Sequence, residues 1–184
     1  MRSSIPVIFL AGALAAAPVC PAQSSFGPEI SAEDFHQHLG NLAAFVPAGN
    51  ASAGYAESLR RAYLKYQFIR LGLRNQPPAC VPAERSLQAM VPGTGTGASP
   101  VVYMAQWQKP AEIAALLEIA ERFMTQQPRP KHDVVFLFSP NNRTDLATCA
   151  LLRNAAVVIH PTGMETRDAS SLVRDLITLQ RQGK

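Results

Sequence analysis

The sequence predicts an α/β protein, with a helical N-terminal half followed by a small parallel three-stranded βαβαβ sheet with flanking helices. Three short apolar runs, over residues 101–105, 134–138 and 155–159, are separated by two segments with apolar residues at helical spacing. Continuous rather than alternating hydrophobicity is expected of strands that are covered on both faces. Because strands joined by helical crossovers usually pair in parallel, these runs predict a parallel sheet with helices packed on its faces.

The first 22 residues have the pattern of a secretory signal peptide. Arg2 precedes an apolar run, Ile5–Ala17, that is shorter than the roughly 20 residues a membrane-spanning helix needs. Small residues then lead to Ala22, where we expect cleavage. The alternatives are an N-terminal membrane anchor and a lipid on Cys20. We expect a mature chain that is periplasmic or secreted and has no transmembrane segment.

Charge and cysteine content indicate which partners and which disulfide to expect. The 184-residue chain has a formal net charge of +4, which favours solubility and gives no reason to expect a nucleic-acid partner. Cys80 and Cys149 remain after the leader is removed, and in an oxidising compartment we expect them to form a disulfide. Such a bond would close a loop of about 70 residues and stabilise the fold by about 4 kcal/mol in the chain-entropy model. Two buried free thiols are the alternative.

Residues 23–91 form the expected helical region. Ser31 is a candidate N-cap for a first helix that runs to about Val46. A second helix, about Ala53 to Arg74, has an apolar and aromatic stripe, and a proline predicts a short helix over about Ala83 to Val91. The second helix also has a basic face, which we interpret either as a surface for an anionic partner or as an ordinary solvated exterior. Its residues are Arg60, Arg61 and Lys65.

A Gly-, Thr- and Pro-rich linker over residues 92–100 separates this region from the α/β region, residues 101–184. The linker lacks a Gly-Lys-Ser/Thr ending and precedes a strand, so it does not have the pattern of a phosphate-binding loop. The predicted disulfide would join the two regions, which favours one co-folded unit over residues 31–182.

Three helices are expected within the α/β region. The first begins at Pro110 and ends near Gln127. The residues expected outside its apolar face are Glu112, Glu118, Glu121 and Arg122. The second begins after Ser139, a candidate N-cap followed by proline. The last covers about Asp168 to Arg181.

Polar residues that could form a binding site lie at the carboxyl ends of the predicted strands. In open α/β sheets, ligands usually bind outside this edge, where helix N-termini also point. The candidate binding residues there are Gln106, Asn141, Asn142 and His160.

His160 is also the main catalytic candidate, because a histidine can act as an acid or a base near neutral pH. Ser139 is a candidate nucleophile, with Asp133 or Asp168 orienting the histidine. Against this, Ser139 precedes Pro140 and has no Gly-x-Ser-x-Gly surroundings. The alternative for His160 is a turn histidine bonded to the backbone.

No metal site or cofactor is expected from the spacing of ligand-type residues. His36 and His38 are two residues apart, so on a helix they point about 200° away from each other. No other group of histidine, cysteine and carboxylate residues has a ligand spacing in the sequence.

Part of the chain resembles the periplasmic Rap1a/Tai immunity family. The resemblance rests on Ala53-Gly54-Tyr55 at a helix start, Cys80-Val81-Pro82, and an alanine-rich helix from Ala114 to Phe123, and it covers about residues 31–124. It implies a helical protein that binds a secreted amidase toxin. Ser52 stands where the family has a cysteine, so the family's usual disulfide cannot form here.

Three functions follow from these observations. The leading interpretation is an exported, non-catalytic periplasmic binding or accessory protein, whose partner is another envelope protein. The second is immunity to a secreted toxin. The third is a small hydrolase or transferase that uses His160.

Overall fold

The computed structural model describes residues 29–45, 53–76, 86–140, 149–164 and 166–183. The predicted signal peptide, Cys80, Asn141 and Asn142 lie outside these residues. In the described part of the chain, no helix is long and apolar enough to cross a membrane.

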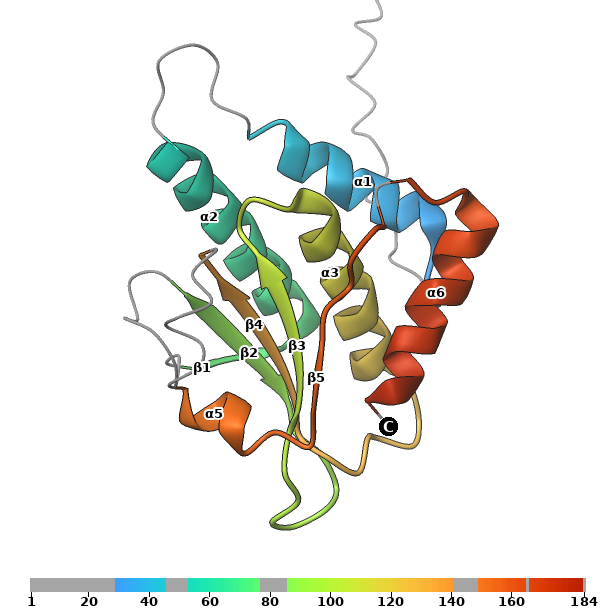
Figure 1. The fold of residues 1–184 in the computed structure, drawn as a ribbon. Coiled ribbons are helices and arrows are strands. Elements are labelled where there is room, and N and C mark those ends of the chain that lie inside the picture. Colours follow the sequence, from blue (N-terminus) through green and yellow to red (C-terminus); the bar gives the residue numbers. More distant parts are fainter. Residues whose placement is uncertain (1–28, 46–52, 77–85, 141–148, 165, 184) are drawn as a thin grey trace, which may run out of the picture.

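The structure confirms the α/β fold, with a mixed sheet of five strands where the sequence predicted three (Figure 1). The strand order is β1-β2-β4-β3-β5, and β3 pairs in parallel with both β4 and β5. β2 pairs antiparallel with β4 and with β1. The strands are β1 (Arg74–Gln76), β2 (Leu87–Val91), β3 (Val101–Gln106), β4 (Val134–Ser139) and β5 (Val157–Ile159).

The two additional strands correct the prediction for the end of the helical region. Residues 87–91 were expected to be helical, but they form β2, which pairs with the whole of β4 from Leu87↔Phe138 to Val91↔Val134. This pairing satisfies backbone groups along the second side of β4 that would otherwise lack partners in the core. The helix expected to end at Arg74 stops at Leu71, since Gly72 adopts a positive φ of 69° that ends a helix.

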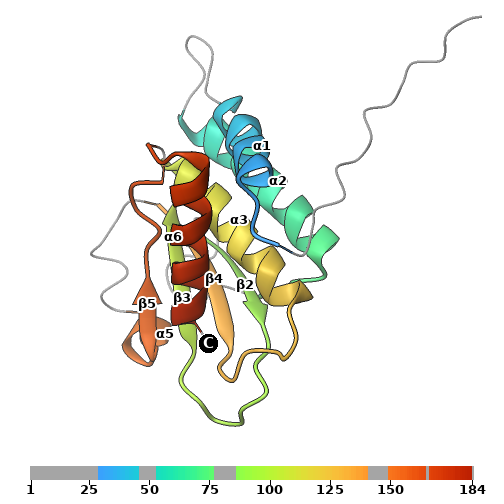
Figure 2. The same cartoon turned by 90° about the vertical axis from the view of Figure 1, so that its right-hand side faces the viewer.

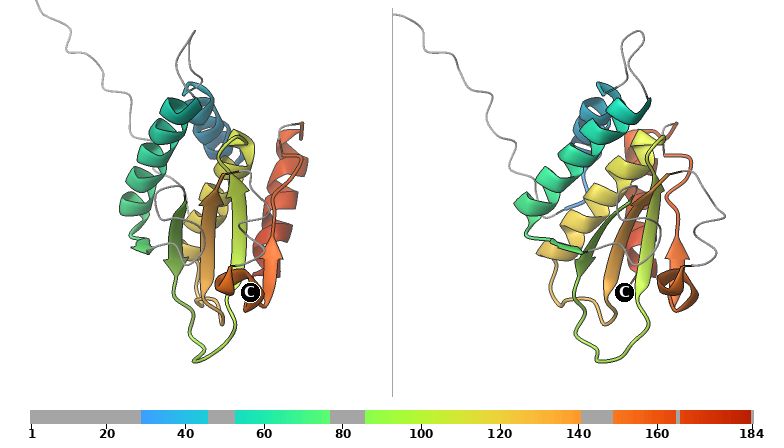
Figure 3. Two further views of the ribbon diagram at one scale, coloured as in Figure 1. Left: turned by 60° about the vertical axis from the view of Figure 1, so that its left-hand side comes forward. Right: turned by 90° about the vertical axis from the view of Figure 1, so that its left-hand side faces the viewer.

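Helices cover one face of the sheet in a layer organised around α3 (Figure 2, Figure 3). Apolar side chains of α1, α2 and α6 share one core cluster with α3 and with the strands, represented by Phe35, Phe68, Leu176 and Phe136. This cluster includes residues from both regions that the sequence distinguished. The helices are α1 (Ala32–Ala43), α2 (Ala53–Leu71), α3 (Pro110–Thr125) and α6 (Ala169–Gln182).

The other face of the sheet packs against α5 (Ala150–Arg153). Val102 and Val135 form a smaller cluster there with Cys149, which is buried and disulfide-bonded. Because Cys80 lies outside the described residues, its pairing with Cys149 stays a prediction.

The segment between β2 and β3, predicted as a flexible linker, is held against the segment before β4. The backbone N–H of Thr94 donates to the Pro130 carbonyl at 2.9 Å. Gly93 passes so close to His132 that an added Cβ would lie 2.4 Å from its carbonyl carbon. Only glycine fits at this crossing without a shift of backbone.

α3 is buried along almost its whole length, from Ala111 to Glu121. The sequence placed Glu118 and Glu121 outside the apolar face of this helix, but both carboxylates are buried. The reason is that α1 and α2 cover the side of α3 that faces away from the sheet. The structure therefore places charged residues inside the helical layer.

Candidate functional site

The predicted carboxyl edge forms at the ends of β3 and β4. Gln106 and Ser139 are register partners in the last pair of these strands, and the backbone N–H of Trp107 donates to the Ser139 carbonyl at 3.1 Å. α3 begins directly beside this edge. The buried Glu112 in its first turn accepts a hydrogen bond from the Gln106 backbone N–H at 3.3 Å and one from Lys109 Nζ at 2.8 Å.

The basic face of α2 approaches the same edge. Arg60 Nη1 donates to the Trp107 carbonyl at 2.8 Å, and the Arg61 guanidinium carbon lies 5.5 Å from the centroid of the Trp107 ring. Arg61 Nη2 also lies 3.3 Å from Glu57 Oε1. Two groups of residues that the sequence proposed separately, the basic helix and the strand ends, therefore meet at Trp107.

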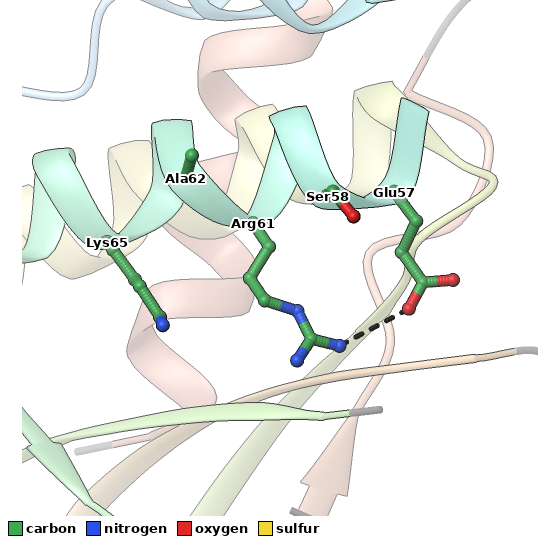
Figure 4. A pocket seen from close by; sticks show the side chains of 5 residues that line it. All are labelled: Glu57, Ser58, Arg61, Ala62 and Lys65. Atoms are coloured by element: carbon green, nitrogen blue, oxygen red, sulfur yellow. Dashed lines mark hydrogen bonds and ion pairs between the residues drawn. The ribbon is translucent and has the colours of Figure 1, made fainter. Parts of the chain in front are cut away.

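An open hollow of about 270 Å³ lies along this face of α2 (Figure 4). Arg61 and Lys65 extend from the same side of the helix, and Glu57 pairs with Arg61 at one end. Such a hollow suits a small anionic group, because two cations and one carboxylate line it. The lining residues are Glu57, Ser58, Arg61, Ala62 and Lys65.

His160 follows β5 and is exposed, but it does not lie beside Ser139. Ile159 pairs with Tyr103 of β3, so His160 lies two residues short of the level of Gln106 along the strands. In the sheet, β3 stands between β5 and β4. Standard strand spacings then separate the Cα atoms of His160 and Ser139 by about 12 Å, too far for a hydrogen bond between their side chains. Ser139 is fully buried, and its hydroxyl has no hydrogen-bond partner among the described residues.

The two aspartates proposed to orient His160 are engaged elsewhere. Asp133 accepts from the Gly93 backbone N–H at 2.8 Å, at the amino end of β4. Asp168 is the N-cap of α6 and accepts from the backbone N–H groups of Ser170 and Ser171 at 3.1 and 3.0 Å. The structure therefore does not assemble a serine–histidine–aspartate triad from these residues.

A second polar cluster lies within the helical layer, where α1 meets α3. His38, Glu118 and Glu121 are all buried, and each offers a ligand atom within 4.8 Å of the others. His38 Nε2 is 3.7 Å from Glu118 Oε1, and His38 Nδ1 is 2.7 Å from Tyr63 Oη. Sequence spacing alone missed this cluster because its histidine and its carboxylates come from segments far apart in the chain.

Both carboxylates of this cluster have an additional partner. The Ser31 backbone N–H donates to Glu118 Oε2 at 3.0 Å. Arg70 Nη2 of α2 donates to Glu121 Oε1 at 2.7 Å. Residues from two other segments thus fix the orientation of the two carboxylates.

Burial keeps His38 and Glu118 uncharged near neutral pH. Loss of solvent raises the pKa of Glu118 to about 8 and that of Glu121 to about 7. Burial, assisted by the Arg70 charge, lowers the pKa of His38 to about 4. The 3.7 Å approach of His38 to Glu118 is therefore a contact between neutral groups and not an ion pair.

No family model matches the chain, and no curated protein does either. Several solved structures are similar to part of the chain. One is the YXEP protein of Bacillus subtilis, described as a dinuclear metal-binding peptidase of the M20 family, with 13% identity and a TM-score of 0.50 over 68% of this chain and 42% of that one. The aminopeptidase PepT of Bacillus cereus has 12% identity and a TM-score of 0.47 over 66% and 39% of the two chains. A leucine aminopeptidase precursor of Bacteroides thetaiotaomicron has 16% identity and a TM-score of 0.44 over 60% and 47%.

This likeness contradicts the leading interpretation of the sequence, a non-catalytic binding or accessory protein. The fold is shared with the Bacillus subtilis M20 peptidase, at 13% identity and over 42% of the length of that chain. The resemblance to the Rap1a/Tai family, an envelope partner and the cellular location are not addressed by these comparisons and stay predictions.

The described residues at the carboxyl edge do not fit a two-metal centre of the kind named for the Bacillus subtilis peptidase. Glu112 is the carboxylate there, and it already pairs with Lys109. Among the described residues, the group of three or more ligand-type side chains close enough to hold an ion is His38, Glu118 and Glu121, which lies within the helical layer.

Proposed function

We propose that this chain is an exported hydrolase with a peptidase-like fold, whose substrate binds at the carboxyl edge of the parallel strands. The observation that carries the proposal is the fold shared with the Bacillus subtilis M20 peptidase. The convergence of Arg60 and Arg61 on Trp107 supports the position of the site. Export rests on the predicted signal peptide, and a disulfide between Cys149 and Cys80 suits an oxidising compartment.

In this proposal the hollow beside α2 binds an acidic part of the substrate. Arg61 and Lys65 supply the positive charge. Trp107 itself is buried, and its ring lies 5.5 Å from the Arg61 guanidinium carbon, so it helps to position Arg61 at the hollow. A substrate that carries a carboxylate suits this arrangement.

His160 acts as the general base in the proposed reaction. Its imidazole removes a proton from an attacking water molecule as the oxygen of that water bonds to the substrate carbonyl carbon. The same proton then passes to the leaving amine or alkoxide when its bond to the carbonyl carbon breaks. Ser139 takes no part, because it is buried and lies about 12 Å from His160 by strand spacing.

Hydrolysis of fluorogenic amides and esters that carry a carboxylate tests the proposal. The purified chain is expected to cleave at least one such compound, and His160→Ala to lower kcat by about 100-fold or more. His36→Ala, which removes an exposed histidine of α1, is the matched control and is expected to keep full activity. Equal activity of wild type and His160→Ala would remove His160 from the mechanism, and no cleavage of any compound would contradict the hydrolase assignment.

The hollow is tested separately with Lys65→Ala. Since Lys65 is exposed and contributes to binding rather than to bond cleavage in this proposal, KM for the acidic substrates is expected to rise with kcat nearly unchanged. The same variant should leave KM for substrates without the carboxylate unaltered.

A further inference from the structure

The buried cluster of His38, Glu118 and Glu121 has the donor set of a cation site. Imidazole nitrogen and carboxylate oxygen are both ligands of zinc and of similar divalent transition metals. In a tetrahedral zinc site with bonds of 2.0–2.1 Å, neighbouring ligand atoms lie about 3.4 Å apart. His38 Nε2 and Glu118 Oε1 are separated by 3.7 Å, which is too long for a good hydrogen bond and close to that spacing.

The environment of Glu118 is an independent indication that a cation binds here. Its side chain is 1% exposed, and Oε1 has no hydrogen-bond partner among the described residues while it faces the imidazole. A buried polar atom without a partner is costly and is rare in native proteins. A cation between Glu118 and His38 would satisfy this oxygen.

The partners of the three side chains resemble the outer shell of a metal site. Metal-ligating histidines usually bond through their second nitrogen to another group, and ligating carboxylates are also held by hydrogen bonds. His38 Nδ1 contacts Tyr63 Oη at 2.7 Å. Glu118 is held by the Ser31 backbone N–H, and Glu121 by Arg70.

The balance of charges around the cluster also favours a divalent cation. The Arg70 guanidinium acts electrostatically on both Glu118 and Glu121. When both are ionised, these two carboxylates exceed the single positive charge of Arg70 by one. Buried carboxylates must either be protonated or be paired with cations, and a divalent ion supplies the missing charge.

We propose that His38, Glu118 and Glu121 form a structural site for one divalent transition-metal ion of the zinc type, which fastens α1 to α3. This site is separate from the carboxyl edge, because all three side chains lie within the helical layer. It does not depend on the hydrolase proposal, and its test does not use activity.

The test begins with the purified full chain, stripped of metal with a chelator and titrated with Zn²⁺ by calorimetry and with Co²⁺ by visible absorption. We expect one ion per chain with a Kd in the micromolar range or tighter, and a ligand-field spectrum with Co²⁺ of low coordination number. Glu118→Gln and His38→Gln are each expected to weaken Zn²⁺ binding at least 100-fold. Tyr63→Phe, which removes an outer contact of His38, should weaken it by about 10-fold.

His36→Ala is the matched control, since His36 lies on the same helix but is exposed. It is expected to keep wild-type affinity and the Zn²⁺-induced rise in Tm, whereas Glu118→Gln and His38→Gln lose that rise. Circular dichroism establishes that each variant folds, and if one does not, the other carries the test. No bound ion in wild type, or equal affinity in wild type and in the folded Glu118→Gln or His38→Gln variant, would overturn the proposal.

Discussion

Replacing Glu118 by glutamine is expected to stabilise the metal-free protein at high pH and to change little at pH 5. The glutamine amide keeps the size of the carboxyl group. Its oxygen can accept from the Ser31 backbone N–H, and its NH₂ group can donate to His38 Nε2. The substitution therefore removes an ionisable group while it keeps the local contacts.

The direction of the pKa shift determines whether the free energy of unfolding rises or falls with pH. Burial raises the pKa of Glu118 from 4.5 to about 8, so the unfolded chain releases a proton that the folded chain retains. Wild type therefore loses stability as pH rises from about 4.5 to 8. The full shift corresponds to at most about 5 kcal/mol, because each tenfold change in an acid equilibrium equals about 1.4 kcal/mol. Local relaxation around the carboxylate reduces this, and we expect a difference on the order of 3 kcal/mol between the two proteins at pH 8.

Urea unfolding at pH 5, 6, 7 and 8, with a chelator present throughout, measures this difference. His38 destabilises both proteins as pH falls from 6.5 to about 4, so its contribution largely cancels in the comparison. Glu57→Gln, at a partly exposed surface pair, is the matched control and should parallel wild type. If the free energies of Glu118→Gln and wild type also ran parallel across the four pH values, Glu118 would not be a neutral, buried carboxyl group.

Three further substitutions have expected outcomes in unfolding measurements. Gly93→Ala should destabilise by about 2 kcal/mol or more, since its Cβ would lie 2.4 Å from the His132 carbonyl carbon, and an unchanged midpoint would contradict this close crossing. Gly40→Ala, on an exposed face of α1 with nothing within 4 Å, should instead stabilise by up to about 1 kcal/mol. Arg70→Met should destabilise by about 2 kcal/mol at pH 8 and by less at pH 6, where Glu121 takes up a proton; a pH-independent loss would argue against a charged Glu121.

The three parallel strands and the long helices could be predicted because their signals are local. Continuous apolar runs marked β3, β4 and β5, and helical spacing marked α1, α2, α3 and α6. β2 could not be found in this way. Its sequence, Leu-Gln-Ala-Met-Val, carries no clear alternation, and pairing with β4 determines its conformation.

The buried cluster illustrates a different limit of sequence reasoning. Glu118 and Glu121 are three residues apart, so a shared helix face could be predicted, but the helices that cover that face come from residues far earlier in the chain. The sequence did contain one signal that the acidic residues of α3 are buried. Apolar residues surround α3 on most sides, as in a helix that is buried all round, and this pattern argues against placing its acidic residues in solvent.

The burial of α3 has a consequence for how the protein opens. Because α3 touches the sheet on one side and three helices on the others, its amide hydrogens have no route to solvent through movement of a single neighbour. Exchange of those hydrogens then requires the cooperative opening of the whole domain, while short outer elements such as α5 and β5 can exchange through local fluctuations. α3 is therefore the part of the chain whose exchange rates report the global free energy of unfolding.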